Sequence, residues 1–233
     1  RTKNAGIVDV GWALTFTFVV ALFGLSTGRW PPIAVVTIAW SLRLGGYLIA
    51  RGAASGPEEG RYADLRARWA PHAARKFFVF FQAQAALTAI LASAFVVPFV
   101  RAPSCDAVMY AGLALSAIGI VGESVADAQL ARFKRRHKGR VCDVGLWSWS
   151  RHPHYFFEWC VWNGYAVYDL ACWPWGLIAL APQAIILGSI FGVTGIPPTE
   201  KQALRSKGEA YAEYQRRVSR FVPMPPKRAR PSA

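Results

Sequence analysis

The chain has 233 residues, of which 54% are hydrophobic and 17% are charged, and its mean hydropathy is +0.24. A soluble domain usually carries more charge, so this balance argues against a soluble protein, and the gathering of apolar residues into long runs predicts a polytopic membrane protein. The net charge of +14 does not indicate a nucleic-acid partner, because the cations lie between the apolar runs, where membrane topology and acidic lipids account for them.

Six apolar segments follow one another along the chain, each near the roughly 20 residues that cross a bilayer. We therefore predict an all-α membrane helix bundle, one integral membrane domain over residues 1–233, with a disordered tail from 224 to 233. The four cysteines have neither zinc-binding nor disulfide spacing, so no metal is expected. The predicted spans are residues 7–27, 30–50, 77–100, 107–130, 155–172 and 174–195.

The cations are distributed unequally over the two sides of this bundle. One side, formed by the N-terminus, residues 51–76, residues 132–151 and the tail from Lys201, carries 24 Lys and Arg residues. The other side carries only Arg29 and Arg101. By the positive-inside rule the basic loops and the C-terminus are cytoplasmic, and we expect a bacterial inner-membrane protein.

Charged residues within the first two spans are candidates for function. Asp9 lies in the first span, where a carboxylate is costly, although it could also reach water near the helix end. Arg43 in the second span could pair with Asp9 or extend its guanidinium to the membrane surface. Tyr47, one turn further along, could donate a hydrogen bond into a cavity.

A short amphipathic helix is predicted after the second span, because apolar residues recur at positions 62, 65 and 69. This helix either lies on the membrane surface or brings Arg61 and Arg66 to phosphate groups. The fourth span ends with Glu123 and Asp127, four residues apart on one helical face and followed by a cationic run. These acids could bind ribose or amide groups of a nucleotide, or pair with the nearby arginines.

The stretch from Gly145 to Glu158 is the most informative part of the sequence. Pro153 can occupy the first turn of a helix, which places His154 and Glu158 on one face with Tyr155 beside them. A basic loop followed by an acid just inside a membrane helix predicts a site for an anionic cofactor. The alternative is an ordinary basic loop with a polar helix start. Thr199 is predicted to cap a further helix before an amphipathic tail.

These segments, in this order, resemble the steroid 5-alpha-reductase family, especially its bacterial branch of small membrane proteins of undefined substrate. The chain is similar, more weakly, to the isoprenylcysteine carboxyl methyltransferases, through its Arg-His-Pro-x-Tyr element. It departs from the bacterial reductases at His154, where Asn is common, and at Phe157, where Gly is common. The segments that carry the resemblance are 9–12, 43–45, 61–62, 145–147, 150–155 with Glu158, and the tail from Glu200 through Tyr214 to Pro223.

The resemblance implies a seven-helix, NADPH-dependent reductase, with one helix before Arg1, that acts on a lipid entering from the membrane. We also expect a monomer. It would reduce the carbon–carbon double bond of an enone, such as a 3-oxo-4-ene steroid. Asp9 would hold the carbonyl, with Tyr47 as the nearest phenol because Trp40 takes the family's tyrosine position. The implied cofactor residues are Arg61, Arg66, Asp127, Lys134, Arg140, Arg151, His154, Tyr155, Glu158, Glu200 and Tyr214.

Two other functions remain open. A methyltransferase that uses S-adenosylmethionine would need an adenosine pocket but no phosphate-binding arginines. The other is a membrane scaffold or transporter, of which the transporter is disfavoured because its polar groups would gather near the bilayer midplane, whereas here they lie at the cytoplasmic helix ends. The chain has no Gly-x-Gly-x-x-Gly pattern, so a dinucleotide site would be built from helix ends and loops instead of a Rossmann unit.

Overall fold

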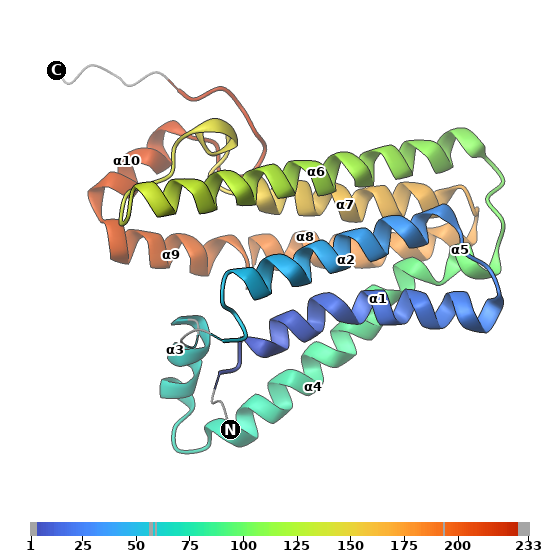
Figure 1. Cartoon of the computed structure of the whole chain (residues 1–233), viewed down its shortest axis with the longest axis horizontal. Helices are drawn as coiled ribbons and strands as arrows, with labels where there is room; N and C mark the ends of the chain where they lie inside the picture. Colours follow the sequence, from blue (N-terminus) through green and yellow to red (C-terminus); the bar gives the residue numbers. More distant parts are fainter. Residues whose placement is uncertain (1–3, 56–57, 59, 193, 228–233) are drawn as a thin grey trace. The chain divides into compact units, whose positions relative to one another are not determined.

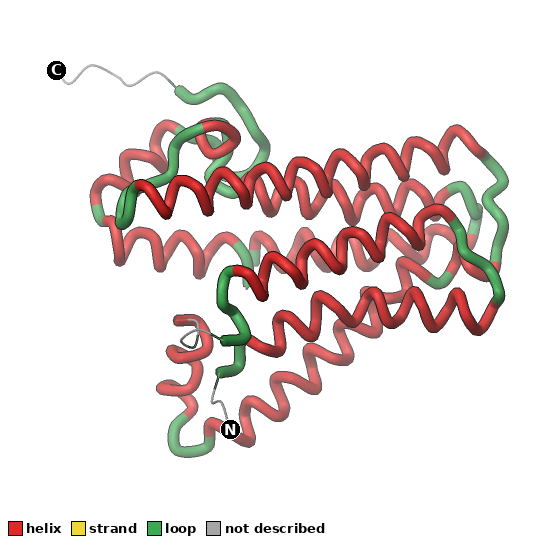
Figure 2. The backbone as a smooth tube through the Cα atoms, viewed as in Figure 1, coloured by secondary structure: helices red, strands yellow, loops and turns green. Residues whose placement is uncertain are grey.

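The computed structural model describes residues 4–55, 58, 60–192 and 194–227, with residues 60 and 61 described by their backbone alone. Within these residues the chain is helical and has no β-strand (Figure 2). By length and composition, five of its helices can cross a membrane. The predicted all-α polytopic membrane fold is therefore confirmed. These five helices are Ile7–Thr27, Pro32–Ala50, Ala73–Phe95, Asp106–Arg136 and the run Trp175–Lys207.

The helices are labelled in Figure 1 in chain order. They are α1 (Ile7–Thr27), α2 (Pro32–Ala50), α3 (Gly60–Trp69), α4 (Ala73–Ala92), η1 (Ser93–Phe95), α5 (Val97–Val100), α6 (Asp106–Arg136), η2 (Gly145–Ser148), α7 (Pro153–Leu170), η3 (Trp175–Ala179), α8 (Leu180–Phe191), α9 (Ile196–Lys207) and α10 (Glu209–Arg217).

The observed helices depart from the predicted spans at several ends. The third span, expected to be continuous over 77–100, consists of α4, η1 and α5, and the fourth continues through the cationic run to Arg136. The fifth corresponds to α7, which is not among the five apolar helices because Glu158, Asn163 and Asp169 make it more polar. A membrane crossing by α7 therefore stays a prediction. In the last run, α9 carries four charged residues and lies beyond the apolar part.

The polar helix α9 begins earlier than predicted. Its first residue is Ile196, with Gly195 at the N-cap, and two prolines occupy the first turn, where a missing backbone N–H costs nothing. The Thr199 hydroxyl donates a hydrogen bond of 2.8 Å to the Gly195 carbonyl from inside the helix. The prediction that Thr199 caps this helix is therefore wrong.

The chain divides into two compact units. Unit 1 extends to Asp106 and also contains Asp169–Pro182, whereas unit 2 contains Ala107–Tyr168 and the chain from Gln183 onward. The expectation of one catalytic domain stays a prediction, and each unit is described separately below.

Unit 1 is organised around the contact between α1 and α2. The Ser41 hydroxyl on α2 donates to the Ala13 carbonyl at 2.6 Å and accepts a hydrogen bond of 2.7 Å from the Thr17 hydroxyl, so polar groups join the two apolar helices. Beside them the rings of Phe16 and Trp40 are fully buried, with centroids 5.5 Å apart. This core holds the start of α1, which carries Asp9.

Unit 2 is organised around the contact between α6 and α7. Small residues line this contact, and a Cβ added to Gly112 would meet the backbone of Gly164 and Tyr168. Such residues let membrane helices approach closely and pack through van der Waals contacts. Nearer the start of α7, a Cβ added to Gly119 would meet the backbone of Phe157 and Val161, so the part of the helix beside His154 and Glu158 also lies close to α6.

Candidate functional site

In unit 1 the Asp9 carboxyl meets a tyrosine hydroxyl. Asp9 lies in the first turn of α1, and its Oδ1 accepts a hydrogen bond of 2.8 Å from Oη of Tyr62 in α3. Asp9 is half-buried and Tyr62 is 1% exposed. An acid and a phenol are therefore paired, but the phenol comes from a helix that the sequence assigned to the membrane surface or to phosphate binding.

The predicted phenol, Tyr47, makes different contacts. Its ring packs beside Val10 and Leu48, and the guanidinium carbons of Arg43 and Arg51 lie 5.6 and 5.9 Å from its centroid. A cation near the face of an aromatic ring is attracted by the ring quadrupole. A catalytic role for Tyr47 stays a prediction, whereas Tyr62 is observed to donate a hydrogen bond to Asp9.

Aromatic rings enclose Tyr62. The centroids of Phe77 and Phe81 lie 6.2 and 6.3 Å from its ring, and these two phenylalanines are stacked at 5.6 Å. Trp69 meets Phe77 edge to face at 5.0 Å. These contacts fix the ring of Tyr62, so its hydroxyl is held in place against Asp9.

An ion pair holds α3 near the start of α1. Oε1 of Glu58 accepts hydrogen bonds from the backbone N–H of Ala5 at 3.1 Å and from Nη2 of Arg66 at 2.6 Å, while Nε of Arg66 donates to Oε2 at 3.0 Å. The hydrogen bond from Arg66 lowers the pKa of Glu58. Arg66, a predicted phosphate ligand, is thus engaged within the chain. The side chain of Arg61, the other such candidate, lies outside the described residues.

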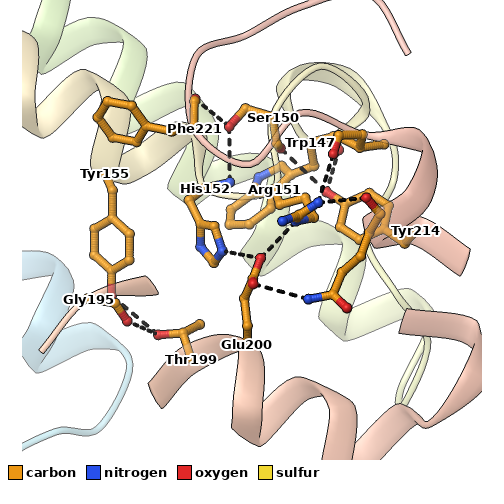
Figure 3. A network of polar contacts seen from close by, with 12 residues as sticks. Trp147, Ser150, Arg151, His152, Tyr155, Gly195, Thr199, Glu200, Tyr214 and Phe221 are labelled. Carbon is orange, nitrogen blue, oxygen red and sulfur yellow. Dashed lines mark hydrogen bonds and ion pairs between the residues drawn. The ribbon is translucent and has the colours of Figure 1, made fainter. Parts of the chain in front are cut away.

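In unit 2, Glu200 on α9 is the centre of a polar network (Figure 3). Its Oε1 accepts a hydrogen bond from Nε of Arg151 at 2.7 Å and lies 3.2 Å from Nε2 of His152, and its Oε2 accepts from the Gln215 amide at 3.1 Å. Nη1 of Arg151 donates to the carbonyls of Gln215 and Val218, at 2.7 and 2.9 Å. The network joins the loop before α7 to α9 and to the C-terminal segment.

Charge and burial together set the protonation of this network. Burial would raise the pKa of Glu200, but the hydrogen bond from His152 and the charge of Arg151 outweigh it and lower the pKa to about 2. Burial lowers the pKa of His152 below its ordinary value, since the ring is 1% exposed. At neutral pH, therefore, Glu200 is an anion paired with Arg151, and His152 is neutral.

Hydrogen bonds of Tyr214 and Trp147 also hold the loop before α7 in place. The Tyr214 hydroxyl donates to the carbonyls of Trp147, at 2.5 Å, and Ser150, at 3.4 Å, and burial raises the pKa of this phenol. The indole N–H of Trp147 donates to the Ala126 carbonyl at 2.9 Å. The loop turns at Gly145, whose φ of +58° lies in the left-handed region that favours glycine.

A row of rings follows this loop into α7. The His154 ring lies 5.3 Å from Trp147, in a stacked arrangement, and 4.1 Å from Tyr155, and the ring of His152 stacks on Tyr155 at 5.7 Å. His154 and Tyr155 are half-buried. The Tyr155 hydroxyl lies 3.5 Å from that of Thr199 on α9. Such rings offer flat faces to a planar group of a ligand.

The remaining predicted cofactor residues belong to the same unit. Asp127 is 6% exposed on α6, and Glu158 is half-buried on α7. Lys134 and Arg140 are exposed at the end of α6 and in the loop that follows. Pro153 is the first residue of α7, as predicted, so His154 and Glu158 lie one turn apart.

Residues of these clusters that were not assigned to a site from the sequence include Tyr62, His152, Gln215 and Glu58. Tyr62 and Asp9 are 53 positions apart, and helical spacing identified position 62 only as apolar. His152 stands in the Arg-His-Pro element that the analysis singled out, but its partner Glu200 is 48 positions away. A local sequence pattern does not predict contacts between residues that lie 48 or 53 positions apart in the chain.

A comparison with known protein families adds one finding, a match of residues 1–218 to the family model described as "Protein of unknown function (DUF1295)". The chain belongs to the DUF1295 family. No curated protein and no solved structure matches it. The family description assigns no reaction, so the chemistry of this DUF1295 member has to be argued from its own residues.

Proposed function

We propose that the protein is an NADPH-dependent reductase of the carbon–carbon double bond of an enone lipid, such as a 3-oxo-4-ene steroid. The observation that carries this proposal is the hydrogen bond of 2.8 Å between Tyr62 and Asp9. A carboxyl group and a phenol in contact can share a proton and donate a hydrogen bond to a carbonyl oxygen. Reduction of an enone requires such a hydrogen-bond donor while negative charge develops on the carbonyl oxygen.

The Asp9–Tyr62 pair stabilises the enolate that forms when the double bond is reduced. The Tyr62 hydroxyl, which donates to Oδ1 of Asp9 in the structure, would turn to donate to the substrate oxygen, and Asp9 would position it. The aromatic enclosure of Tyr62 excludes water, which strengthens a hydrogen bond to a developing oxyanion. NADPH, when bound, would supply the hydride that the β-carbon accepts. The α-carbon of the enolate would then take up a proton from solvent water, which completes the saturated ketone.

The nucleotide is assigned to unit 2, whose donor set fits its chemistry. The exposed cations Lys134 and Arg140 complement phosphate groups, and the Asp127 and Glu158 carboxylates can accept hydrogen bonds from ribose hydroxyls or the carboxamide. The half-buried His154 ring can lie against a base or nicotinamide ring. The cation surplus favours NADPH over NADH because of the extra 2′-phosphate.

The proposal includes an orientation for the chain. The excess of Lys and Arg on one side of the bundle favours a bacterial inner-membrane protein whose basic loops and C-terminus face the cytoplasm, where NADPH is available. The lipid substrate would enter from the bilayer. We expect a monomer.

A second candidate is a methyltransferase that uses S-adenosylmethionine. The observation in its favour is that the predicted phosphate ligand Arg66 is already ion-paired with Glu58, and the predicted cofactor residue Arg151 with Glu200. S-Adenosylmethionine carries no phosphate, so such a site could bind its adenosine without these arginines.

Thermal unfolding of the detergent-solubilised protein separates the two candidates. A ligand that binds only the native state stabilises it by about 2.7 kcal/mol at 100 times its Kd. We expect NADPH to raise the Tm more than NADH, S-adenosylmethionine to have little effect, and the Lys134→Gln/Arg140→Gln variant to lose the preference for NADPH. Consumption of NADPH with a 3-oxo-4-ene steroid tests the reaction. A shift with S-adenosylmethionine alone would overturn the reductase proposal.

A further inference from the structure

The C-terminal segment of residues 219–227, here called the strap, is fixed to unit 2 by its backbone. The Ser219 carbonyl accepts a hydrogen bond from the Arg151 N–H at 2.8 Å, as part of a parallel bridge between Ser150 and Ser219. The Met224 N–H donates to the Trp149 carbonyl and the Lys227 N–H to the Arg217 carbonyl, both at 2.9 Å. The strap therefore has a defined path, although residues 224–227 were predicted to be disordered. The rest of that tail, residues 228–233, lies outside the described residues.

The inner side of the strap covers the end of an apolar helix. Phe221 is 7% exposed and packs edge to face against Phe156 and Trp159 of α7, at 5.6 and 5.8 Å, and against Phe191 at 4.9 Å. Phe191 is the last residue of α8, in the run that is long and apolar enough to cross a membrane. The strap thus lies where the apolar part of that run ends.

The outer side of the strap is apolar and cationic. Val222 is 49% exposed and Met224 48%, and Trp149, whose carbonyl binds the Met224 N–H, is 48% exposed. Arg220 and Lys227 are also exposed, and the Arg220 guanidinium lies 5.8 Å from the Phe191 centroid. Tryptophan, aliphatic side chains and cations together are typical of segments at the boundary between headgroups and acyl chains.

We propose that the strap, together with Trp149, lies in the membrane interface and binds acidic phospholipid headgroups through Arg220 and Lys227. Two observations identify lipid as the occupant. The apolar surface of the strap continues that of α8 through the contact of Phe221 with Phe191. The cations complement the negative charge of acidic headgroups, which attract basic segments beside membrane helices.

Lipid contact would also stabilise the candidate site. The strap joins the backbone of Trp149 and Arg151, and the Ser150 hydroxyl donates to the Phe221 carbonyl at 2.7 Å. Headgroups that hold the strap in place therefore hold the loop that carries the Arg151–Glu200 ion pair. The inference stands independently of the proposed reaction.

Site-directed fluorescence in lipid nanodiscs tests the proposal. The variant Met224→Cys is labelled with bimane in a Cys105→Ser background, because Cys105 is exposed and the other three cysteines are buried. The control is Glu209→Cys, since Glu209 is 78% exposed on the polar helix α10. Quenching by brominated phospholipid and by aqueous iodide is compared in discs of phosphatidylcholine and of its equal mixture with phosphatidylglycerol.

We expect the label at position 224 to be quenched by brominated lipid and shielded from iodide, and the label at position 209 to show the reverse. Phosphatidylglycerol should strengthen the lipid quenching at 224. In the Arg220→Gln/Lys227→Gln variant the ratio of lipid-facing to water-facing label should fall, by about fivefold for each cation lost.

Three outcomes would overturn the proposal. Iodide quenching at position 224 equal to that at 209 would place the strap in water. Shielding from both quenchers would indicate a protein partner or a second copy of the chain. Equal lipid quenching in the two disc compositions would remove the role of acidic headgroups. A Val222→Cys label repeats the test if substitution at position 224 disturbs folding.

Discussion

An acidic side chain in unit 1 contacts a phenol, whereas one in unit 2 contacts a guanidinium group. In unit 1 Asp9 meets the neutral Tyr62, whereas in unit 2 Glu200 meets the Arg151 guanidinium. The guanidinium next to Glu200 helps to hold this carboxylate ionised, and its pKa is lowered to about 2. In unit 2 a carboxylate joined to a cation holds distant segments together, and in unit 1 the Glu58–Arg66 pair does the same, whereas Asp9 accepts a hydrogen bond from a phenol.

The largest effect is expected from breaking the ion pair of unit 2. Arg151→Gln leaves the Glu200 carboxylate, 13% exposed, without its cation and removes two hydrogen bonds to backbone carbonyls. Removing one partner of a buried pair typically costs about 3 to 5 kcal/mol. We expect a large fall in Tm without ligand and faster proteolysis of the C-terminal segment. The control Arg216→Gln breaks the exposed pair with Glu209 and should change the Tm little. An unchanged Tm in Arg151→Gln would mean that the network does not stabilise the fold.

The second largest effect is expected on the rate of enone reduction, from substitutions in unit 1. Tyr62→Phe removes the donor to the developing oxyanion and Asp9→Leu removes the group that positions it, and losing such a donor costs roughly 100- to 1000-fold in kcat. Because the two groups act as a unit, the double variant should be hardly slower than either single one. The matched Asp9→Asn variant keeps an oxygen acceptor for the Tyr62 hydroxyl and should retain a fraction of the activity.

The Tm shift produced by NADPH is the control for these variants, since the nucleotide is assigned to unit 2. It should be the same in Asp9→Leu, Tyr62→Phe and the parent protein. A folded Tyr62→Phe variant that binds NADPH and reduces enones at the parental rate would refute the role of the pair. Loss of the fold in Asp9→Leu alone would indicate that Asp9 is structural.

The difference between the units also explains what the sequence could predict. The span of α1 and the start of α7 at Pro153 follow from runs of neighbouring residues, and both are observed as expected. Thr199 failed as a cap because the two prolines before it fit the first turn, and the helix therefore begins at Ile196. Local sequence patterns therefore predicted the ends of most membrane helices to within a few residues.

The pairing of side chains could not be predicted, because it depends on packing between distant segments. Arg151 was assigned to a cofactor through the family resemblance, but its carboxylate partner lies 49 positions further on. Tyr47 was named because it shares a helix with Trp40, whereas the phenol beside Asp9 is held in α3 by an aromatic cluster and by the Glu58–Arg66 pair. A family resemblance transfers residue types to positions, but it does not say which contacts a side chain already makes.

The smallest effect is a dependence of stability on pH, which should arise in unit 2. Burial lowers the pKa of His152 below 6.5, so the native state binds fewer protons than the unfolded chain as the pH falls through that value. Stability is therefore lost below pH 6.5, at most by about 1.4 kcal/mol per pH unit for one group. The pKa of Glu200 is lowered from 4.5 to about 2, so its contribution is present above pH 4.5 and is lost between these two values.

Two variants separate these contributions in a series of Tm measurements from pH 7 to pH 3. His152→Gln keeps a donor for Glu200 but cannot titrate, so the loss between pH 6.5 and pH 4.5 should become shallower and the loss below pH 4.5 should remain. Tyr62→Phe, in unit 1, should leave the whole profile parallel to that of the parent protein. A His152→Gln profile that parallels the parent one would show that His152 has nearly the same proton affinity in the folded and unfolded chain. We do not expect that result, because His152 is 1% exposed. A protonated ring there would hold its charge away from water and next to the Arg151 cation.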